Sequence, residues 1–157
     1  MSAGGAAVQA MVARVGAAME EHGWSVVALP AEEGRPPFAY TVGLEKNYGH
    51  PEIVLVGEFA SKVVQGVLNA AGAKVKEGAK YEAGQQTKDV VGRFEVAFRG
   101  IEEEVAAKNM PMAQLLQEEA IARPVRALQI FLPDAAGRFP WQRGCEARMA
   151  RSQKALG

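Results

Sequence analysis

The sequence predicts a single α+β domain in which a mostly antiparallel sheet of about five strands is packed by about three helices. Three windows repeat apolar residues at helical spacing, and about five short segments are apolar or alternate between apolar and polar residues. Two pairs of these strands are joined by short loops, which favours antiparallel pairing. The chain has 157 residues, of which 48% are hydrophobic and 23% charged, and this composition excludes wholesale disorder.

The N-terminal half is expected to contain two helices and three strands. Apolar residues at positions 8, 11, 12, 15 and 19 follow one helix face, and Gly23 is expected to end that helix. Strands over 24–29 and 38–44 form a predicted hairpin around a loop with Gly34 and two prolines. A polar turn over 45–51 leads to a uniformly apolar, buried strand over 52–56. Helical spacing returns from Ala60, with Ser61 as a candidate cap and Gly72 at the helix end.

The C-terminal half is expected to contain one helix and two clear strands. Residues 74–88 are polar and Gly-rich and allow a short strand near Tyr81. Residues 93–101 alternate, with Phe94, Val96 and Phe98 on one face, which predicts a half-buried antiparallel strand. A helix over 111–122 and a strand over 125–132 follow. We therefore divide the chain into a flexible terminus at 1–7, an α+β domain at 8–142 and a basic tail at 143–157.

Composition argues against several classes of protein. Eighteen basic residues balance eighteen acidic ones, so capture of nucleic acid by the field of the whole domain is disfavoured. One cysteine excludes a disulfide framework and a thiolate-cluster zinc site, and two histidines are too few for an all-histidine zinc site. No metal or cofactor is expected. The longest apolar run, Ile53 to Val56, is too short to span a membrane, and without a charged leader we expect a cytoplasmic protein.

Two segments in the first half carry candidate site residues. In the strand over 38–44, Tyr40 lies on one face, and the small face that includes Thr41 allows a packed helix or a ligand to approach, with packing favoured. In His50-Pro51-Glu52, the proline biases His50 toward extended geometry. The histidine titrates near neutrality, and the glutamate could orient it for proton transfer. The favoured alternative is that both residues decorate a strand entry, with His50 donating to a backbone carbonyl.

A third segment follows the last strand. Asp134 and Gly137 fit a turn in which the aspartate bonds its own backbone, and Phe139 and Trp141 then bring aromatic surface back to the domain. Trp141 is either a binding hot spot or a lid over the sheet. After Ala135, five basic residues face one acid, a local charge of +4 that includes Arg143. A solubilising tail is the favoured interpretation, and contact with phosphate or an acidic partner is the alternative.

These segments together resemble an uncharacterised, mainly bacterial family known as domain of unknown function 4262. The resemblance is carried by Gly23-Trp24, by Tyr40 to Leu44, by His50-Pro51-Glu52 running into Val56-Gly57, and by Gln129, Leu132-Pro133-Asp134, Gly137 and Phe139-Pro140-Trp141. Two departures stand out. Leu132 occupies a place where the family usually has tryptophan, and residues 153–156 echo only part of a Gln-Pro-Leu-Leu stretch. The resemblance implies a common fold unit and a candidate surface, and it implies no reaction.

Three functional hypotheses follow, in order of preference. The first is a non-enzymatic binding or regulatory module whose partner, a protein or a small molecule, docks near Trp141 and the basic tail, which includes Arg143. The second is a small hydrolase with His50 as base, Glu52 orienting it, and Tyr40 or Thr41 holding the substrate. The third is nucleic-acid contact through the basic tail. We expect the three segments to meet at one end of the sheet, which would place Tyr40, His50, Glu52 and Asp134 around one cavity.

Overall fold

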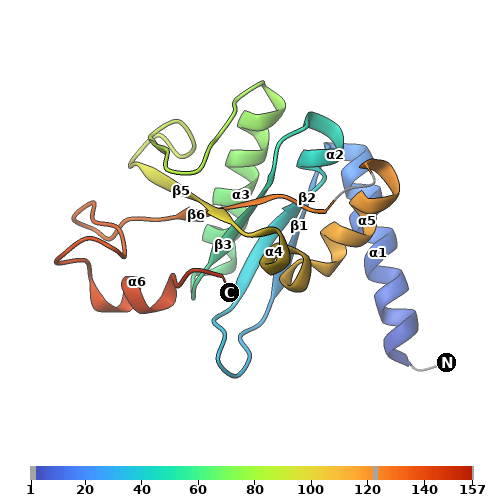
Figure 1. Ribbon diagram of the computed structural model, residues 1–157, viewed down its shortest axis with the longest axis horizontal. Helices are drawn as coiled ribbons and strands as arrows, with labels where there is room; N and C mark the ends of the chain where they lie inside the picture. Colours follow the sequence, from blue (N-terminus) through green and yellow to red (C-terminus); the bar gives the residue numbers. More distant parts are fainter. Residues whose placement is uncertain (1–2, 122–123, 157) are drawn as a thin grey trace.

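Within residues 3–121 and 124–156, which the computed structural model describes, six strands form one mixed sheet (Figure 1). The strands are β1 (Ser25–Leu29), β2 (Phe38–Val42), β3 (Glu52–Val56), β4 (Gln86–Thr87), β5 (Val96–Ile101) and β6 (Ala127–Phe131). Their order is β1-β2-β3-β6-β5-β4, and every neighbouring pair is antiparallel except β3 with β6, which is parallel. The predicted α+β domain with a mostly antiparallel sheet is confirmed.

Helices cover both faces of the sheet (Figure 1). They are α1 (Ala3–His22), α2 (Leu44–Tyr48), α3 (Ser61–Lys76), α4 (Glu103–Asn109), α5 (Pro111–Ile121) and α6 (Ala147–Ser152). Helix α3 packs on one face against Ala39, Ile53 and Leu55, whereas α1, α4 and α5 pack on the other against Tyr40 and Val54. Because side chains alternate along a strand, β2 and β3 bury both of their faces, which explains their nearly continuous apolar sequences. Among the described residues, we find no helix whose length and hydropathy would suit a membrane span.

The predicted hairpin is present, and the turn that leads into it requires a glycine at position 23. Strands β1 and β2 pair with Val27 opposite Tyr40. Gly23 ends α1 with a φ of 99°, and its N–H donates to the Met19 carbonyl at 2.9 Å. A side chain at Gly23 would overlap the Tyr48 hydroxyl, so α2 closes directly onto this turn. The small face of β2 receives α3, which is the packing alternative of the sequence analysis.

The predicted end and cap of the second helix are wrong. Helix α3 continues past Gly72 to Lys76, and its N-cap is Ala60, without a side-chain hydrogen bond. Packing against a neighbouring side chain explains why position 72 is a glycine. A Cβ at this position would come within 2.5 Å of the Trp24 ring. The indole N–H of Trp24 donates to Asn69 on the same helix at 3.0 Å. The absence of a side chain at Gly72 therefore leaves room for the Trp24 ring to pack against α3, and Gly72 does not break the helix.

Other element boundaries also differ from the sequence predictions. Helix α2 begins at Leu44, the last residue of the expected strand over 38–44, and occupies most of the expected polar turn at 45–51. The short strand expected near Tyr81 lies at β4. Strand β5 begins only at Val96, and Phe94 before it is 37% exposed. Helix α1 begins at Ala3, within the segment expected to be flexible. The last residue of the expected helix over 111–122, residue 122, lies outside the described residues.

Candidate functional site

The three candidate segments lie at two opposite ends of the sheet, so the expectation of a common end is wrong. Strand β2 finishes next to the start of β3, which brings Thr41 close to Glu52. Strand β6 runs parallel to β3, so the chain leaves β6 at the end where β3 also finishes. The segment from Leu132 to Trp141 therefore lies one strand length away from His50 and Glu52. The parallel pairing of β3 and β6 is the physical reason, and the sequence predictions assigned no strand order.

At the first end, the Glu52 carboxylate is enclosed by four donors. Its Oε1 accepts the Thr41 hydroxyl at 2.9 Å and the Leu44 N–H at 3.1 Å. Its Oε2 accepts the N–H groups of Gly43 at 3.1 Å and Glu45 at 3.3 Å. These N–H groups belong to the first turn of α2, where a negative charge and an acceptor are both favourable. The carboxylate of β3 therefore caps the short helix that precedes β3.

Glu52 and Thr41 are both inaccessible to a ligand. Each is at most 1% exposed, and the Thr41 hydroxyl also accepts the Ile53 N–H at 2.9 Å. Burial raises the pKa of Glu52 to about 7, although the hydrogen bonds from Gly43 and Thr41 lower it in part. The lone pairs of this carboxylate are directed at protein donors, so its contacts are those of a structural cap.

His50 has both ring nitrogens engaged. Its Nδ1 lies 2.7 Å from the Pro51 carbonyl oxygen, and its Nε2 accepts the Tyr81 N–H at 3.0 Å. This pair of contacts fits the neutral tautomer with the proton on Nδ1. Burial lowers the pKa of His50, which also favours the neutral form. Donation to a backbone carbonyl is the contact that the strand-entry interpretation expects, and it leaves no nitrogen lone pair for a substrate proton.

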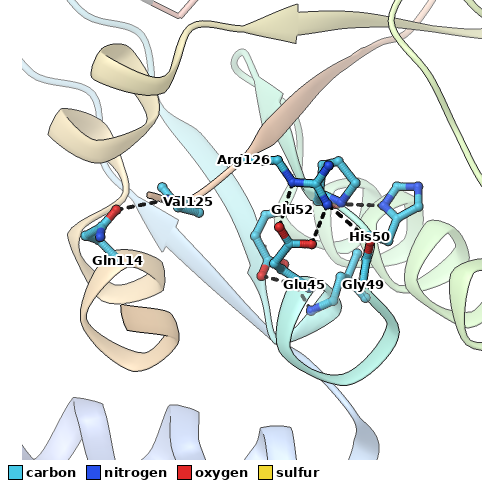
Figure 2. A network of polar contacts seen from close by, with 9 residues as sticks. Glu45, Gly49, His50, Glu52, Gln114, Val125 and Arg126 are labelled. Carbon is cyan, nitrogen blue, oxygen red and sulfur yellow. Dashed lines mark hydrogen bonds and ion pairs between the residues drawn. The ribbon is translucent and has the colours of Figure 1, made fainter. Parts of the chain in front are cut away.

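His50 does line a cavity, which we call the His50 pocket. Its volume is about 420 Å³, and its walls are Tyr48 to Pro51, Val75, Gly78 to Ala83, Arg126 and Leu128. Arg126 is held at its edge by two hydrogen bonds to the buried Glu45 carboxylate, at 2.6 and 2.7 Å, and by a third to the Gly49 carbonyl (Figure 2). The guanidinium is therefore neutralised by a bidentate pair, and this pairing raises the pKa of Arg126.

The Arg126–Glu45 pair is not among the features predicted from the sequence. The two residues are 81 positions apart, and Glu45 was assigned to a polar turn. Recognition of α2 could have revealed it, because a helix that covers the sheet end buries one face, and a glutamate on that face needs charge pairing or several hydrogen-bond donors.

Tyr40 faces the opposite core and is 1% exposed. Burial raises its pKa to about 12, while a backbone hydrogen bond from Met112 lowers it in part. His50 lines the His50 pocket, whereas Tyr40, Glu52 and Asp134 are not among the described residues that line it. The expectation that these four share one cavity is therefore wrong.

At the second end, Asp134 organises the turn that the sequence predicts. Its Oδ1 accepts the N–H groups of Ala136 at 3.0 Å and Arg138 at 2.9 Å, and its Oδ2 accepts that of Glu146 at 2.9 Å. These donors, with Arg138 first, lower the pKa of Asp134. The aspartate therefore fixes both ends of the segment that carries Phe139 and Trp141.

Trp141 forms the centre of a three-layer stack. Its ring stacks on buried Phe139 at 5.1 Å between centroids and 7° between planes, and Phe131 meets it edge-on at 5.1 Å. The Arg99 guanidinium carbon lies 3.7 Å from the Trp141 ring centroid, within the range of a cation–π contact. Trp141 is still 39% exposed. The alternation of residues 93–101 placed Arg99 on the polar face, but nothing in the sequence linked it to a tryptophan 42 positions later.

Beside this stack lies a cavity of about 410 Å³, which we call the Trp141 pocket. It is lined by Arg99 to Ile101, Gln129, Phe131, Pro140, Trp141, Gln153, Ala155 and Leu156. Arg143, also a candidate, is exposed and is not among these lining residues. The Trp141 pocket thus joins one sequence-predicted residue, Trp141, with the unpredicted Arg99.

The last residues of the basic tail form one wall of the Trp141 pocket. The Gln153 amide accepts the Leu132 N–H and donates to the Leu132 carbonyl, both at 2.8 Å. The Gln129 side-chain amide makes a matching pair of bonds with the C-terminal residues. It donates to the Lys154 carbonyl at 2.8 Å and accepts the Leu156 N–H at 2.9 Å. Two reciprocal side-chain pairs therefore hold residues 153–156 against β6, with Gln153 buried.

The described residues include no group of three His, Cys, Asp or Glu side chains that could hold a metal ion. Residues 18–146 match the model of a protein family described as a domain of unknown function, DUF4262. No curated protein and no solved structure matches the chain.

Proposed function

We propose that this chain, which belongs to the DUF4262 family, is a non-enzymatic binding module that recognises its partner at the Trp141 pocket. The observation that carries the proposal is the stack of Phe139, Trp141 and Arg99, whose middle ring is 39% exposed at the mouth of a cavity. Tryptophan and arginine are the residues that most often dominate binding energy at protein interfaces, especially when they border a pocket.

The stack is held rigidly before any partner arrives. Asp134 fixes the turn beneath it through three backbone hydrogen bonds, and Phe139 is 2% exposed. The Gln153 pair with Leu132 fixes the neighbouring wall. A preorganised aromatic surface loses little conformational entropy on binding, so a modest contact area can provide useful affinity.

The contacts at the other end of the sheet support this proposal over a hydrolase. A general base needs a free lone pair within reach of a substrate proton. Both nitrogens of His50 are engaged, and the Glu52 carboxylate accepts four protein donors. The two residues that the hydrolase hypothesis requires therefore have roles in holding α2 and residue 81 in place.

The test compares partner capture by immobilised wild-type protein and by two variants, Trp141→Ala and Arg143→Glu. A lysate of the native host provides the partners, and quantitative mass spectrometry measures them. Phe94→Ala is the matched control, because Phe94 is an aromatic residue of similar exposure, 37%, outside the Trp141 pocket. We expect Trp141→Ala to lower capture of a specific partner about tenfold, and Phe94→Ala to preserve it. Unchanged capture by both Trp141→Ala and Arg143→Glu, with the fold intact by circular dichroism, would overturn the proposal.

A further inference from the structure

We propose that the Trp141 pocket takes a carboxylate carried on an apolar body, with Arg99 as the group that binds the carboxylate. This inference rests on the binding role proposed above for the same pocket, and it specifies the chemistry that the pocket recognises. Four observations support it: the unpaired donors of Arg99, the bonded state of the other polar groups, the balance of charge, and the apolar walls.

Arg99 is oriented but not neutralised. Its guanidinium is held over the Trp141 ring at 3.7 Å, and it has no hydrogen bond or ion pair with any other residue that the structure describes. Stacking uses the face of a guanidinium, whereas its N–H groups lie in its plane and stay available. A planar fork of donors fixed in this way matches the two oxygens of a carboxylate.

The remaining polar side chains of the pocket are engaged and buried. Gln129 and Gln153 each use one amide N–H and one oxygen lone pair in bonds to backbone groups. Both residues are 2% exposed, so the second N–H and the second lone pair of each amide are scarcely accessible to a ligand. The indole N–H of Trp141, a residue of the same pocket, also has no acceptor among the described residues. A ligand that complements this set presents acceptors and no donors.

The net charge of the pocket lining favours a carboxylate over a phosphate monoester. Arg99 is the one charged residue among the described residues that line the pocket, and no acidic side chain lines it. One cation balances one negative charge, which favours a carboxylate over a phosphate monoester that carries nearly two. The walls next to Arg99 are apolar and include Ile101, Phe131, Pro140 and Leu156. A volume of about 410 Å³ suits a small aromatic or branched aliphatic group.

The carboxylate can come from a free small acid or from the C-terminus of a peptide, and the probes separate these sources. Isothermal titration calorimetry measures the affinity of wild-type protein for 3-phenylpropionate and for the neutral 3-phenylpropanamide. A short peptide ending in Phe is tested with a free C-terminus and with an amidated one. Tighter binding of the free-carboxylate peptide than of 3-phenylpropionate identifies a polypeptide source, whereas equal or weaker binding identifies a free acid.

We expect each acid to bind at least about tenfold more tightly than its amide, and we expect added salt to weaken the acids alone. Arg99→Gln should lower the affinity for the acids about tenfold, and Arg99→Lys should retain part of it. Because Arg99 is exposed, neither change threatens the fold. Arg14→Gln, at an exposed position of α1 outside the Trp141 pocket, is the control for a general loss of positive charge, and the affinity of this variant for the acids should stay unchanged.

Equal affinity for acid and amide, full binding by Arg99→Gln, or no binding of either acid up to about 10 mM would overturn the inference. These results are distinguishable from failure of the proposed function. If Trp141→Ala loses a captured partner while no acid binds, the binding module stands and the ligand chemistry is wrong. If the acids bind through Arg99 while capture is unchanged, the ligand chemistry stands and recognition of a protein at this pocket is wrong.

Discussion

The carboxylate of Glu52 accepts the backbone N–H of Leu44 at 3.1 Å, so the first residue of β3 caps the helix that lies between β2 and β3. Thr41 and Gly43, at the end of β2, donate to the same carboxylate. Gly43 has a φ of 121°, and a Cβ there would lie 2.7 Å from the Gly23 carbonyl oxygen. The segments 40–44 and 50–52, through which the sequence resembles its family, thus form one hydrogen-bonded unit.

Removal of this cap should destabilise the protein strongly. Glu52→Ala leaves three backbone N–H groups and the Thr41 hydroxyl without their acceptor in a buried place. Each unsatisfied buried group costs about 1–3 kcal/mol, so we expect the free energy of unfolding to fall by about 3 kcal/mol or more. Urea denaturation measures it. Glu33→Ala, at an exposed loop position, is the control and should change the free energy by less than about 0.5 kcal/mol. A similar small change for Glu52→Ala would show that α2 does not depend on this carboxylate.

Glu52 should also give stability a distinctive pH dependence. Burial raises its pKa from 4.5 to about 7, so the folded protein binds a proton that the unfolded chain releases between these values. Its contribution to stability is therefore fully present below pH 4.5 and is lost as pH rises to about 7. We expect the difference in unfolding free energy between wild type and Glu52→Gln to decrease by about 3 kcal/mol over this range, measured by denaturation at several pH values. A difference that grows with pH would contradict the raised pKa.

His50 should act in the opposite direction. Burial lowers its pKa below 6.5, so the folded state holds the neutral ring while the unfolded chain takes up a proton. The stability that His50 contributes is present above pH 6.5 and is lost as pH falls through the lowered folded pKa. Nitrogen-15 NMR of the imidazole should show a mostly neutral ring with the proton on Nδ1 at pH 6.5, and wild type should lose more stability than His50→Asn on acidification below this pH. A ring that is mostly protonated at pH 6.5 would refute the assignment.

The structural features that can be predicted from the sequence are those encoded by residues close together in the chain. Strands β2 and β3 and the hairpin follow from alternating or continuous apolar residues, and the Asp134 turn follows from its own four residues. The parallel pairing of β3 with β6 does not, because it joins residues about 75 positions apart and sets which segments share a sheet end. Glu45–Arg126 and Arg99–Trp141 have the same origin: each partner is an ordinary surface residue in sequence, and only the strand order brings the two together.

The docking of the C-terminal residues should depend on Gln153. Gln153→Ala removes both hydrogen bonds to Leu132 and leaves its buried N–H and carbonyl unpaired. We expect the free energy of unfolding to fall by about 1–3 kcal/mol and amide hydrogen exchange at Leu132 and Leu156 to accelerate. Gln65→Ala, an exposed amide on α3, should leave both quantities unchanged. Unchanged exchange in Gln153→Ala would mean that Gln129 alone holds this segment.

Two glycines of α3 should respond to alanine in opposite ways. At Gly72 a Cβ would lie 2.5 Å from the Trp24 ring, whereas at Gly66 it would meet nothing within 4 Å. Gly72→Ala must displace the Trp24 ring and strain its hydrogen bond to Asn69, which should cost about 1–3 kcal/mol of unfolding free energy. Gly66→Ala places a better helix former at an exposed position and should add about 0.5–1 kcal/mol. Both are measured by urea denaturation, with Trp24 fluorescence as a second signal that shifts only for Gly72→Ala. If both substitutions stabilised the protein equally, Gly72 would be a tolerated helix glycine and the close contact with Trp24 would be wrong.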